Sequence, residues 1–348
     1  MAHMIDETTG TAAMAYLGKP PWHKLGHEMA AGSSIEDWTE KAGLGWEVLH
    51  SPVLFRDART FCGPQTEGYV PIRRYRDHDV LYRSDTGEPL GIASNNYKAV
   101  QPKDVMAFFD DLVKAGDFQL ETAGALSGGR RIWALAKIGD GAPIIGRDIV
   151  RPYLLLTTSF DGTMATTAKL TAIRVVCHNT LSVAIRDEHR LASKPVSAAV
   201  KVNHTMPFNA AEVRIQLGIF AGAFEKWLIE TKLLANQEID RETASGMVCE
   251  VLKTIPIMTT LPGPRGEVRV VSSDPKVSPA YHRIMALFDG EAIGSDLAQG
   301  QTKWQLINSV TQWIDHERGR NAQGRLSSAW FGPGEVLKRK AYEIALGS

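Results

Sequence analysis

Several features that identify a class of protein at once are missing from this sequence of 348 residues. It has three cysteines, and these lie far apart in the chain: Cys62, Cys177 and Cys249. A sparse and odd cysteine count argues against a disulfide framework and indicates a reducing compartment, so we expect a cytoplasmic protein. The sequence also lacks any run approaching the roughly 18 apolar residues that a membrane-spanning helix needs, so we expect no membrane partner.

An excess of one charge is missing as well, because 39 Lys and Arg residues balance 39 Asp and Glu residues. The whole chain therefore gives no sign of a polyanionic partner, and binding such a partner requires a local basic patch. A candidate lies between residues 126 and 205, where 11 Lys and Arg residues stand against 5 Asp and Glu residues, a net charge of +6. The rest of the chain carries the compensating −6, so the basic charge is concentrated in one region.

Turn signals and hydrophobic periodicity predict an α+β fold, with an antiparallel β-meander core, flanking helices and a mostly helical C-terminal part. Apolar residues at helical spacing predict a helix over 103–115. The strands expected after it cover 118–126, 131–138, 153–160 and 164–176. Gly128-Gly129 and Asp161-Gly162 stand between these strands, and both pairs are typical of tight hairpin turns.

Helix-capping residues suggest further elements on both sides of the meander. Ser34 with Asp37 forms a capping box for a short helix to about residue 41, and Asn179 is a candidate N-cap for a helix through Ile185. From Asn209 an amphipathic pattern predicts one helix of about 30 residues, which could pack against another subunit. Other expected helices cover 241–253, 280–288, 303–317 and 334–346, with a linker or extended arm at 259–278.

These elements divide the chain into three regions. Residues 1–100 form an irregular N-terminal region with short strands, and residues 101–205 form the helix plus antiparallel sheet core. Residues 206–348 form the helical C-terminal region. The basic charge falls in the sheet core, and the surface for self-association falls in the helical region.

The strand over 131–138 is the most informative segment for function, because its alternating residues point to opposite faces. One face is apolar and suits a core: Ile132, Ala134, Ala136 and Ile138. The other face combines two cations with a large aromatic ring: Arg131, Trp133, Leu135 and Lys137. Cations beside an aromatic ring can hold a phosphate backbone while a base stacks. An ordinary solvated sheet face, with Trp133 covered by a helix, is the alternative.

If the cations and Trp133 bind a nucleic acid, the sequence predicts a site for single-stranded DNA on the basic side of the meander. Trp133 would stack on a base, and the other members would bind phosphates. The predicted site consists of Arg130, Arg131, Trp133, Lys137, Lys169 and Arg174.

An enzyme active site is not recognisable, so we predict no catalytic residues, no metal and no cofactor. His23 and His27 have a metal-like spacing, but the prolines before them disfavour a helix. Cys177 and His178 are adjacent in an extended chain and point apart, so the imidazole cannot activate the thiol. The hairpin turn explains Asp161. A nucleic-acid enzyme with a site built from His23, Asp161 and His178 is kept as a third hypothesis.

Five segments of the chain carry a further pattern. The first reads Pro21-Trp22-His23-Lys24-Leu25-Gly26, and the others cover 121–131, 159–163, 173–181 and 304–316. Together they resemble the phage/plasmid-like protein family, whose activity is not known. Phe160 departs from the pattern, since many members are expected to have a histidine there. The resemblance implies an origin in a mobile element.

The order of elements is similar to the core of single-strand annealing proteins of phage recombination, a likeness at the level of fold alone. It implies a non-enzymatic protein of a phage or plasmid that binds and anneals single-stranded DNA. Such proteins form rings or filaments, so we expect a homo-oligomer that assembles through the helical region. The alternative is a non-enzymatic interaction module that inhibits host defence.

Overall fold

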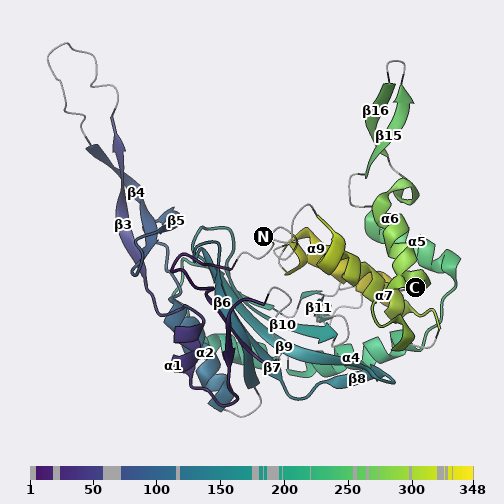
Figure 1. Cartoon of the computed structure of the whole chain (residues 1–348), viewed down its shortest axis with the longest axis horizontal. Coiled ribbons are helices and arrows are strands. Elements are labelled where there is room, and N and C mark those ends of the chain that lie inside the picture. The colour runs from purple at the N-terminus through teal and green to yellow at the C-terminus, as the bar shows by residue number, and fades with distance from the viewer. Residues whose placement is uncertain are drawn as a thin grey trace.

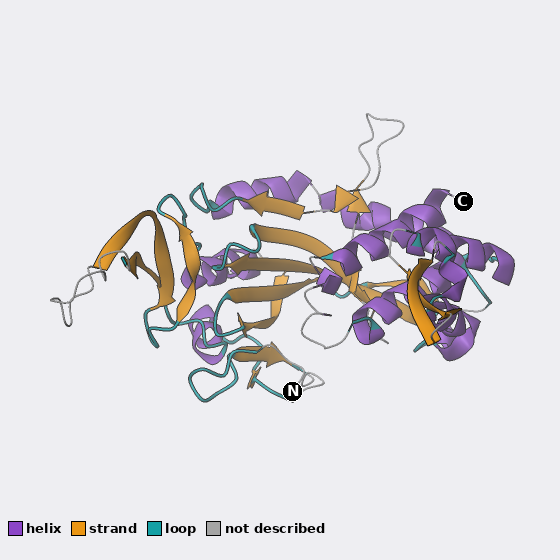
Figure 2. Cartoon of the chain, turned by 90° about the horizontal axis from the view of Figure 1, so that it is seen from above, coloured by secondary structure: helices purple, strands orange, loops and turns teal. Residues whose placement is uncertain are grey.

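A central sheet occupies the middle of the molecule. Two hairpin arms project to the same side from the two ends of the molecule (Figure 1). This computed structural model describes residues 5–18, 24–57, 72–114, 118–174, 180–182, 184–185, 196–197, 199–219, 221–253, 257–263, 266–272, 274–297, 300–319, 325, 328–330 and 332–347. Seen from above, the long strands of the sheet run side by side, with the C-terminal helices gathered at one end (Figure 2).

The central sheet has nine strands, ordered β11-β10-β9-β7-β6-β1-β2, with β14 pairing with β10 and β8 with β9. All these pairs are antiparallel except β1 with β2. The strands are β1 (Met14–Leu17), β2 (His27–Met29), β6 (Phe118–Leu126), β7 (Arg131–Ile138), β8 (Ala142–Ile145), β9 (Asp148–Ser159), β10 (Thr166–Arg174), β11 (Thr180–Ser182) and β14 (Ala199–Val202). The predicted α+β fold with an antiparallel meander is confirmed.

The turns within the meander follow from their sequences. Gly128 and Gly129 have φ of +71° and +88°, a conformation that a side chain would strain, and they join β6 to β7. Gly162 has φ of +74°, and the carboxylate of Asp161 accepts a hydrogen bond from the Thr163 backbone N–H at 3.0 Å. The carboxylate of Asp161 therefore serves the turn between β9 and β10.

One face of the sheet packs on helices and forms the core. These helices are α1 (Ile35–Lys41), α2 (Pro102–Lys114), α3 (Ala210–Ile219) and α4 (Ala221–Ala235). Ile132, Ala134 and Ala136 of β7 are completely buried in the same cluster as Phe108 and Phe109 of α2. The apolar face predicted for β7 is therefore the core face.

The first helix begins as its sequence predicts. Ser34 Oγ accepts a hydrogen bond from the Asp37 backbone N–H at 3.1 Å, and Asp37 accepts one from the Ser34 backbone N–H at 3.2 Å. Trp38 then fixes the helix by entering the core. The predicted capping box is confirmed.

The N-terminal region contributes to two sheets. Strands β1 and β2 extend the central sheet, whereas β3 (Val48–Arg56), β4 (Ile72–Arg83) and β5 (Pro89–Ser94) form a separate three-stranded sheet. The hairpin of β3 and β4 projects from one end of the molecule and is called the β3–β4 arm (Figure 1). Arg83 anchors its base, because it is buried, paired with Asp6 and Asp85, and its guanidinium lies 4.6 Å from the Trp46 ring centre.

The C-terminal region is helical, with a second hairpin arm. Its helices are α5 (Arg241–Leu252), α6 (Pro279–Ala286), α7 (Lys303–Gln312) and α9 (Pro333–Gly347), with π-helical turns at Leu287–Glu291 and Trp313–Glu317 and 3₁₀ turns at Pro275–Val277 and Ser295–Leu297. Strands β15 (Ile257–Gly263) and β16 (Gly266–Ser272) form the arm where the sequence suggested an extended segment. No helix among the described residues is both long and apolar enough to cross a membrane.

One predicted helix is wrong. The segment expected to be helical from Asn179 to Ile185 contains β11 and β12 (Ala184–Ile185), and Asn179 itself lies outside the described residues. Thr180 pairs with Ile173 at the edge of the central sheet, and β12 pairs with β13 (Val196–Ser197), so tertiary pairing overrides the local capping signal.

The segment predicted as one helix from Asn209 is helical on both sides of residue 220, as α3 and α4, and residue 220 itself lies outside the described residues. Asn209 caps the first, since its Oδ1 accepts from the Glu212 backbone N–H at 3.2 Å. The two halves pack on different partners, α3 on β14 and α4 on β8 and α7.

Candidate nucleic-acid interface

The candidate interface is the face of the central sheet opposite α1 to α4, here called the inner face. On β7 and β9 it consists of Arg131, Trp133, Leu135, Lys137, Arg151, Tyr153 and Leu155, as the strand alternation and pairing register require. Leu135 lies opposite Leu155, and both pack with Tyr153 in a small buried cluster. The inner face therefore has an apolar floor, with the cations placed around it.

Trp133 lies flat on the sheet. Gly124 faces it across the β6–β7 ladder, and a Cβ atom built on Gly124 would come within 2.5 Å of the indole Cη2. Its Nε1 donates a hydrogen bond to Thr122 Oγ1 at 3.2 Å, which fixes the ring across β6. The side chain is half-buried, and Leu25 and Tyr16 of the N-terminal segment pack in the cluster beside it. The indole is therefore held in place without being sealed in the interior.

A β-bulge brings a carboxylate to the inner face. The register shifts between Leu120 and Thr122, so Glu121 is an extra residue on β6. Glu121 lies close to Tyr153, whose pKa is raised first by burial and then by its hydrogen bond to Glu121. Glu121 Oε2 and Arg151 Nε are buried, and neither has a hydrogen-bond partner among the described residues. Glu121 and Arg151 are therefore both neighbours of the buried Tyr153 phenol.

Sequence reasoning missed Glu121, Arg151 and Tyr153. The last two could have been found, because strand alternation from Arg151 through Tyr153 to Leu155 places them on one face. No local sequence signal distinguishes the bulge at Glu121, since its position depends on pairing with β7.

The three predicted cations nearest Trp133 in the sequence are exposed or half-buried. Arg130 is exposed in the turn before β7. Arg131 is half-buried and donates from Nη2 to Thr163 Oγ1 at 3.2 Å. Lys137 is half-buried at the other end of the strand, opposite Tyr153. These three cations stand at both ends of the strand that carries Trp133.

Lys169 does not lie on an open surface as predicted. It is on the inner side of β10, but α9 lies over that part of the sheet (Figure 1). Lys169 is 6% exposed, and its Nζ lies 3.2 Å from Glu335 Oε1 of α9. Burial lowers the pKa of Lys169, and the charge of Glu335 opposes this effect. The prediction of a phosphate contact at Lys169 is corrected, because α9 excludes a strand from this position.

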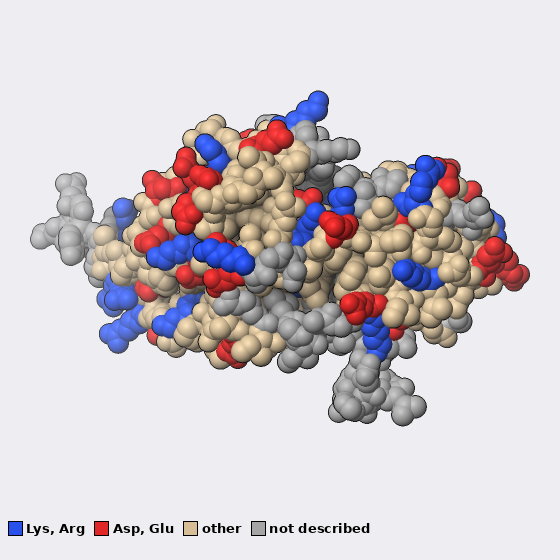
Figure 3. All heavy atoms as spheres, turned by 90° about the horizontal axis from the view of Figure 1, so that it is seen from below, with Lys and Arg blue, Asp and Glu red and all other residues tan. Residues whose placement is uncertain are grey.

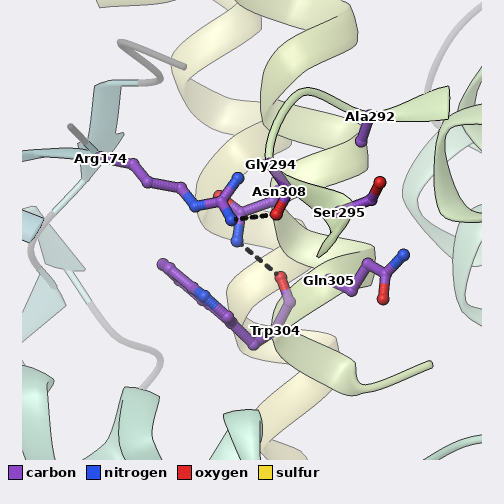
Figure 4. Close-up of a pocket in the computed structure, with 7 residues that line it drawn as sticks. All are labelled: Arg174, Ala292, Gly294, Ser295, Trp304, Gln305 and Asn308. Atoms are coloured by element: carbon purple, nitrogen blue, oxygen red, sulfur yellow. Dashed lines mark hydrogen bonds between the residues drawn. The ribbon is translucent and has the colours of Figure 1, made fainter. Parts of the chain in front are cut away.

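Arg174 is likewise buried, with 3% exposure. Its Nε donates to Asp148 Oδ1 at 2.7 Å, and Trp304 Nε1 donates to Asp148 Oδ2 at 2.8 Å. The guanidinium also donates to the backbone oxygens of Ile293 at 2.9 Å and Gly294 at 3.0 Å. Figure 4 shows Arg174 pointing at this loop from the sheet. It joins the sheet to the C-terminal helices, so its predicted role in DNA binding is corrected.

A small pocket lies beside this network. Its lining residues come from the end of β10, from the loop after α6 and from α7: Arg174, Ala292, Gly294, Ser295, Trp304, Gln305 and Asn308 (Figure 4). Asn308 Nδ2 donates to the Trp304 backbone oxygen at 3.0 Å, and Gln305 Nε2 donates to the Phe288 oxygen at 3.0 Å. The side chains here hold the C-terminal helices together rather than facing a ligand.

The other residues singled out from the sequence are not brought together. His23, Cys62, Cys177 and His178 lie outside the described residues. Cys249 is partly buried on α5, and burial raises the pKa of its thiol, which reduces its nucleophilic form. Within the described part of the chain, no three His, Cys, Asp or Glu side chains are grouped to hold a metal ion.

Comparison with known proteins gives one match. The profile of a family described as a domain of unknown function, DUF932, matches residues 89–330, about 70% of the chain. No curated protein and no solved structure matches this chain significantly. The matched range includes every residue of the inner face named above, and it carries no information on a phage or plasmid origin.

Proposed function

We propose, since this chain belongs to the family described as a domain of unknown function, DUF932, that its inner face binds single-stranded DNA and brings complementary strands together. The protein would act in recombination by strand annealing, in a phage or plasmid. The proposed contacts are fewer than the sequence suggested and include one new cation: Arg130, Arg131, Trp133, Lys137 and Arg151.

The observation that supports this proposal best is the position of Trp133. Its indole lies flat against Gly124, is fixed by Thr122 and keeps part of its surface exposed. A base that stacks on an aromatic side chain gains about 1–3 kcal/mol, whatever its identity. Because the ring is already held in place, little conformational entropy is lost when a base stacks on it.

The charges around Trp133 suit moderate binding of a polyanion. Lys137, Arg151 and Arg131 surround the apolar floor, and Glu121 offsets part of their charge. Annealing itself needs no catalytic residue. It needs cations that reduce repulsion between strands and bases that stay free to pair. A few cations around the partly exposed Trp133 meet both needs.

The test is titration of a labelled oligothymidylate at several salt concentrations, with Trp133→Ala and Lys137→Ala variants. Trp133→Ala should weaken binding about 5- to 150-fold, the loss of one stacking contact. Lys137→Ala should reduce the slope of log K against log salt by about 0.7, the loss of one single-strand phosphate contact. Lys114→Ala, on the opposite side of the sheet at an exposed position of α2, should bind as the unaltered protein does.

Two results would contradict the proposal. One is binding that does not change with salt, and the other is binding that survives Trp133→Ala at full strength. An annealing assay with two complementary oligonucleotides then asks whether the bound strand can still pair. Binding without faster pairing would support a strand-holding protein and contradict the annealing role.

A second function has one observation in its favour. The β3–β4 arm exposes large apolar side chains, which is unusual on a protein without partners: Leu54, Phe55, Ile72 and Tyr75. A non-enzymatic interaction module that inhibits host defence would use such a surface. A protein that binds no oligonucleotide at any salt concentration would favour this alternative.

A further inference from the structure

One face of the β3–β4 arm gathers arginines. The pairings Leu54 with Arg74 and Arg56 with Ile72 place these four side chains on a common face. Arg76 follows on β4 within the irregular stretch that the register shift between Pro52 and Leu54 marks, and it is exposed. The name arginine face is used for Leu54, Arg56, Ile72 and Arg74 together with the exposed Arg76 next to them along β4. The opposite face of the paired stretch carries Phe55 and Arg73.

The three cations of the arginine face are exposed and weakly compensated. Arg74 is 54% exposed at its side chain, and its Nη2 lies 3.5 Å from Asp79 Oδ1, a surface pair that contributes little. Arg56 and Arg76 are exposed. On the opposite face Arg73 differs, because its Nε lies 2.8 Å from the buried carboxylate of Asp57. The net positive charge is therefore concentrated on the arginine face.

The apolar side chains between these arginines point to a binding surface. Leu54 is 60% exposed and Ile72 is 62% exposed. A two-stranded hairpin gains little stability by itself, so exposing such residues on it is costly unless something covers them. The positive charge of the arginines indicates what kind of molecule covers this surface. Arginine side chains match phosphate groups in shape and charge, and a polyanion can satisfy three of them at once.

The arm continues from the inner face. Its base residue Arg83 contacts Gly129, in the turn that also carries Arg130. Arg76 lies seven residues further along β4, at most about 23 Å at the rise of a strand, since β4 is irregular in between. Lys and Arg side chains are visible on the surface at the end of the molecule from which the arm projects (Figure 3). The arm therefore joins the central sheet next to the turn that carries Arg130.

We propose that the arginine face of the β3–β4 arm is a second nucleic-acid site, which binds the phosphate backbone of the strand beyond the inner face. The inference rests on the proposed function for the identity of the polyanion. In this proposal the two surfaces have different roles: the inner face stacks a base, and the arm binds phosphates. Contact with a second copy of the chain is the competing use of the same surface.

The experiment compares the full chain with a triple variant, Arg56→Gln with Arg74→Gln and Arg76→Gln. Binding is measured against salt for a short oligothymidylate and for one several times longer. For the long strand, the variant should lose about 2 units of the slope of log K against log salt, since each single-strand phosphate contact contributes about 0.7. For the short strand, which the inner face can hold alone, affinity should stay within about 2-fold.

Arg73→Gln is the matched control, because Arg73 is an arginine of the same strand on the other face and is paired with Asp57. It should leave both slopes unchanged. A triple variant that keeps the full slope while Trp133→Ala weakens binding overturns this inference and leaves the proposed function in place. If the triple variant loses slope while Trp133→Ala binds at full strength, the arm is supported as a nucleic-acid site and the role of the inner face is contradicted. A variant whose only change is a smaller particle in light scattering assigns the surface to a second copy and overturns the inference.

Discussion

Lys137 and Lys169 lie on the same face of the same sheet, but their surroundings differ completely. Lys137 on β7 is half-buried opposite Tyr153. Lys169 on β10 is buried beneath α9 and paired with Glu335. The role of a cation on a strand is therefore decided by a helix that follows more than 150 residues later in the chain.

The two arginines at the strand ends differ in the same way. Arg131 begins β7 and bonds a neutral hydroxyl, that of Thr163. Arg174 ends β10 and is enclosed by Asp148 and two backbone oxygens. A buried cation loses its hydration, and it needs a carboxylate and further acceptors to offset that loss. The covered half of the sheet supplies these groups, so its cations serve the fold.

The largest effect should come from Arg174→Ala. Removing one partner of a buried pair leaves Asp148 uncompensated, and the free energy of unfolding should fall by about 3–5 kcal/mol. Urea denaturation measures this loss. Arg147→Ala removes an exposed arginine nearby and should change stability by less than about 0.5 kcal/mol. Equal stability of the two variants would remove the structural role assigned to Arg174.

A direct test of the comparison pairs Lys169→Ala with Lys137→Ala. Lys169→Ala strips Glu335 of its partner and should cost about 3 kcal/mol, whereas Lys137→Ala should cost less than about 0.5 kcal/mol. Oligonucleotide binding should show the opposite order, with Lys137→Ala the weaker binder. Replacing both members of the buried pair, Lys169→Met with Glu335→Leu, should recover most of the stability. If the double variant is as unstable as Lys169→Ala, the uncompensated charge is not the cause.

The smallest effect concerns Tyr153 and depends on pH. Burial and the hydrogen bond to Glu121 raise its pKa, so the folded protein keeps the phenolic proton after the unfolded chain has lost it. The contribution of Tyr153 to stability is thus fully present below the ordinary tyrosine pKa of about 10 and falls as pH rises above it.

Tyr153→Phe lacks this ionisation and should cost about 1 kcal/mol at neutral pH. The difference in unfolding free energy between the two proteins should shrink above a pH of about 10. Tyr97, whose pKa burial also raises, is present in both proteins and cancels in the difference. A difference that stays constant with pH would place Tyr153 in water rather than within the buried cluster with Leu135 and Leu155.

Local sequence was sufficient wherever a few neighbouring residues determine the backbone. The capping box at Ser34, the strands β6 and β7 and their Gly128-Gly129 turn are where the sequence predicts them. Local sequence was insufficient after Asn179. There, pairing with β10 makes a strand of a segment whose first residue predicted the start of a helix. The bulge at Glu121 belongs to the same group, because it exists only through the register with β7.

By itself, the sequence determined the α+β class, the two faces of β7 and the concentration of cations in the meander, because alternation and local charge are properties of adjacent residues. Only the tertiary structure decided which cations stay at the surface. It buried Lys169 and Arg174 under the C-terminal helices and left Trp133 and Lys137 partly exposed. Desolvation of a charge depends on everything that packs against it, and those neighbours come from distant parts of the chain.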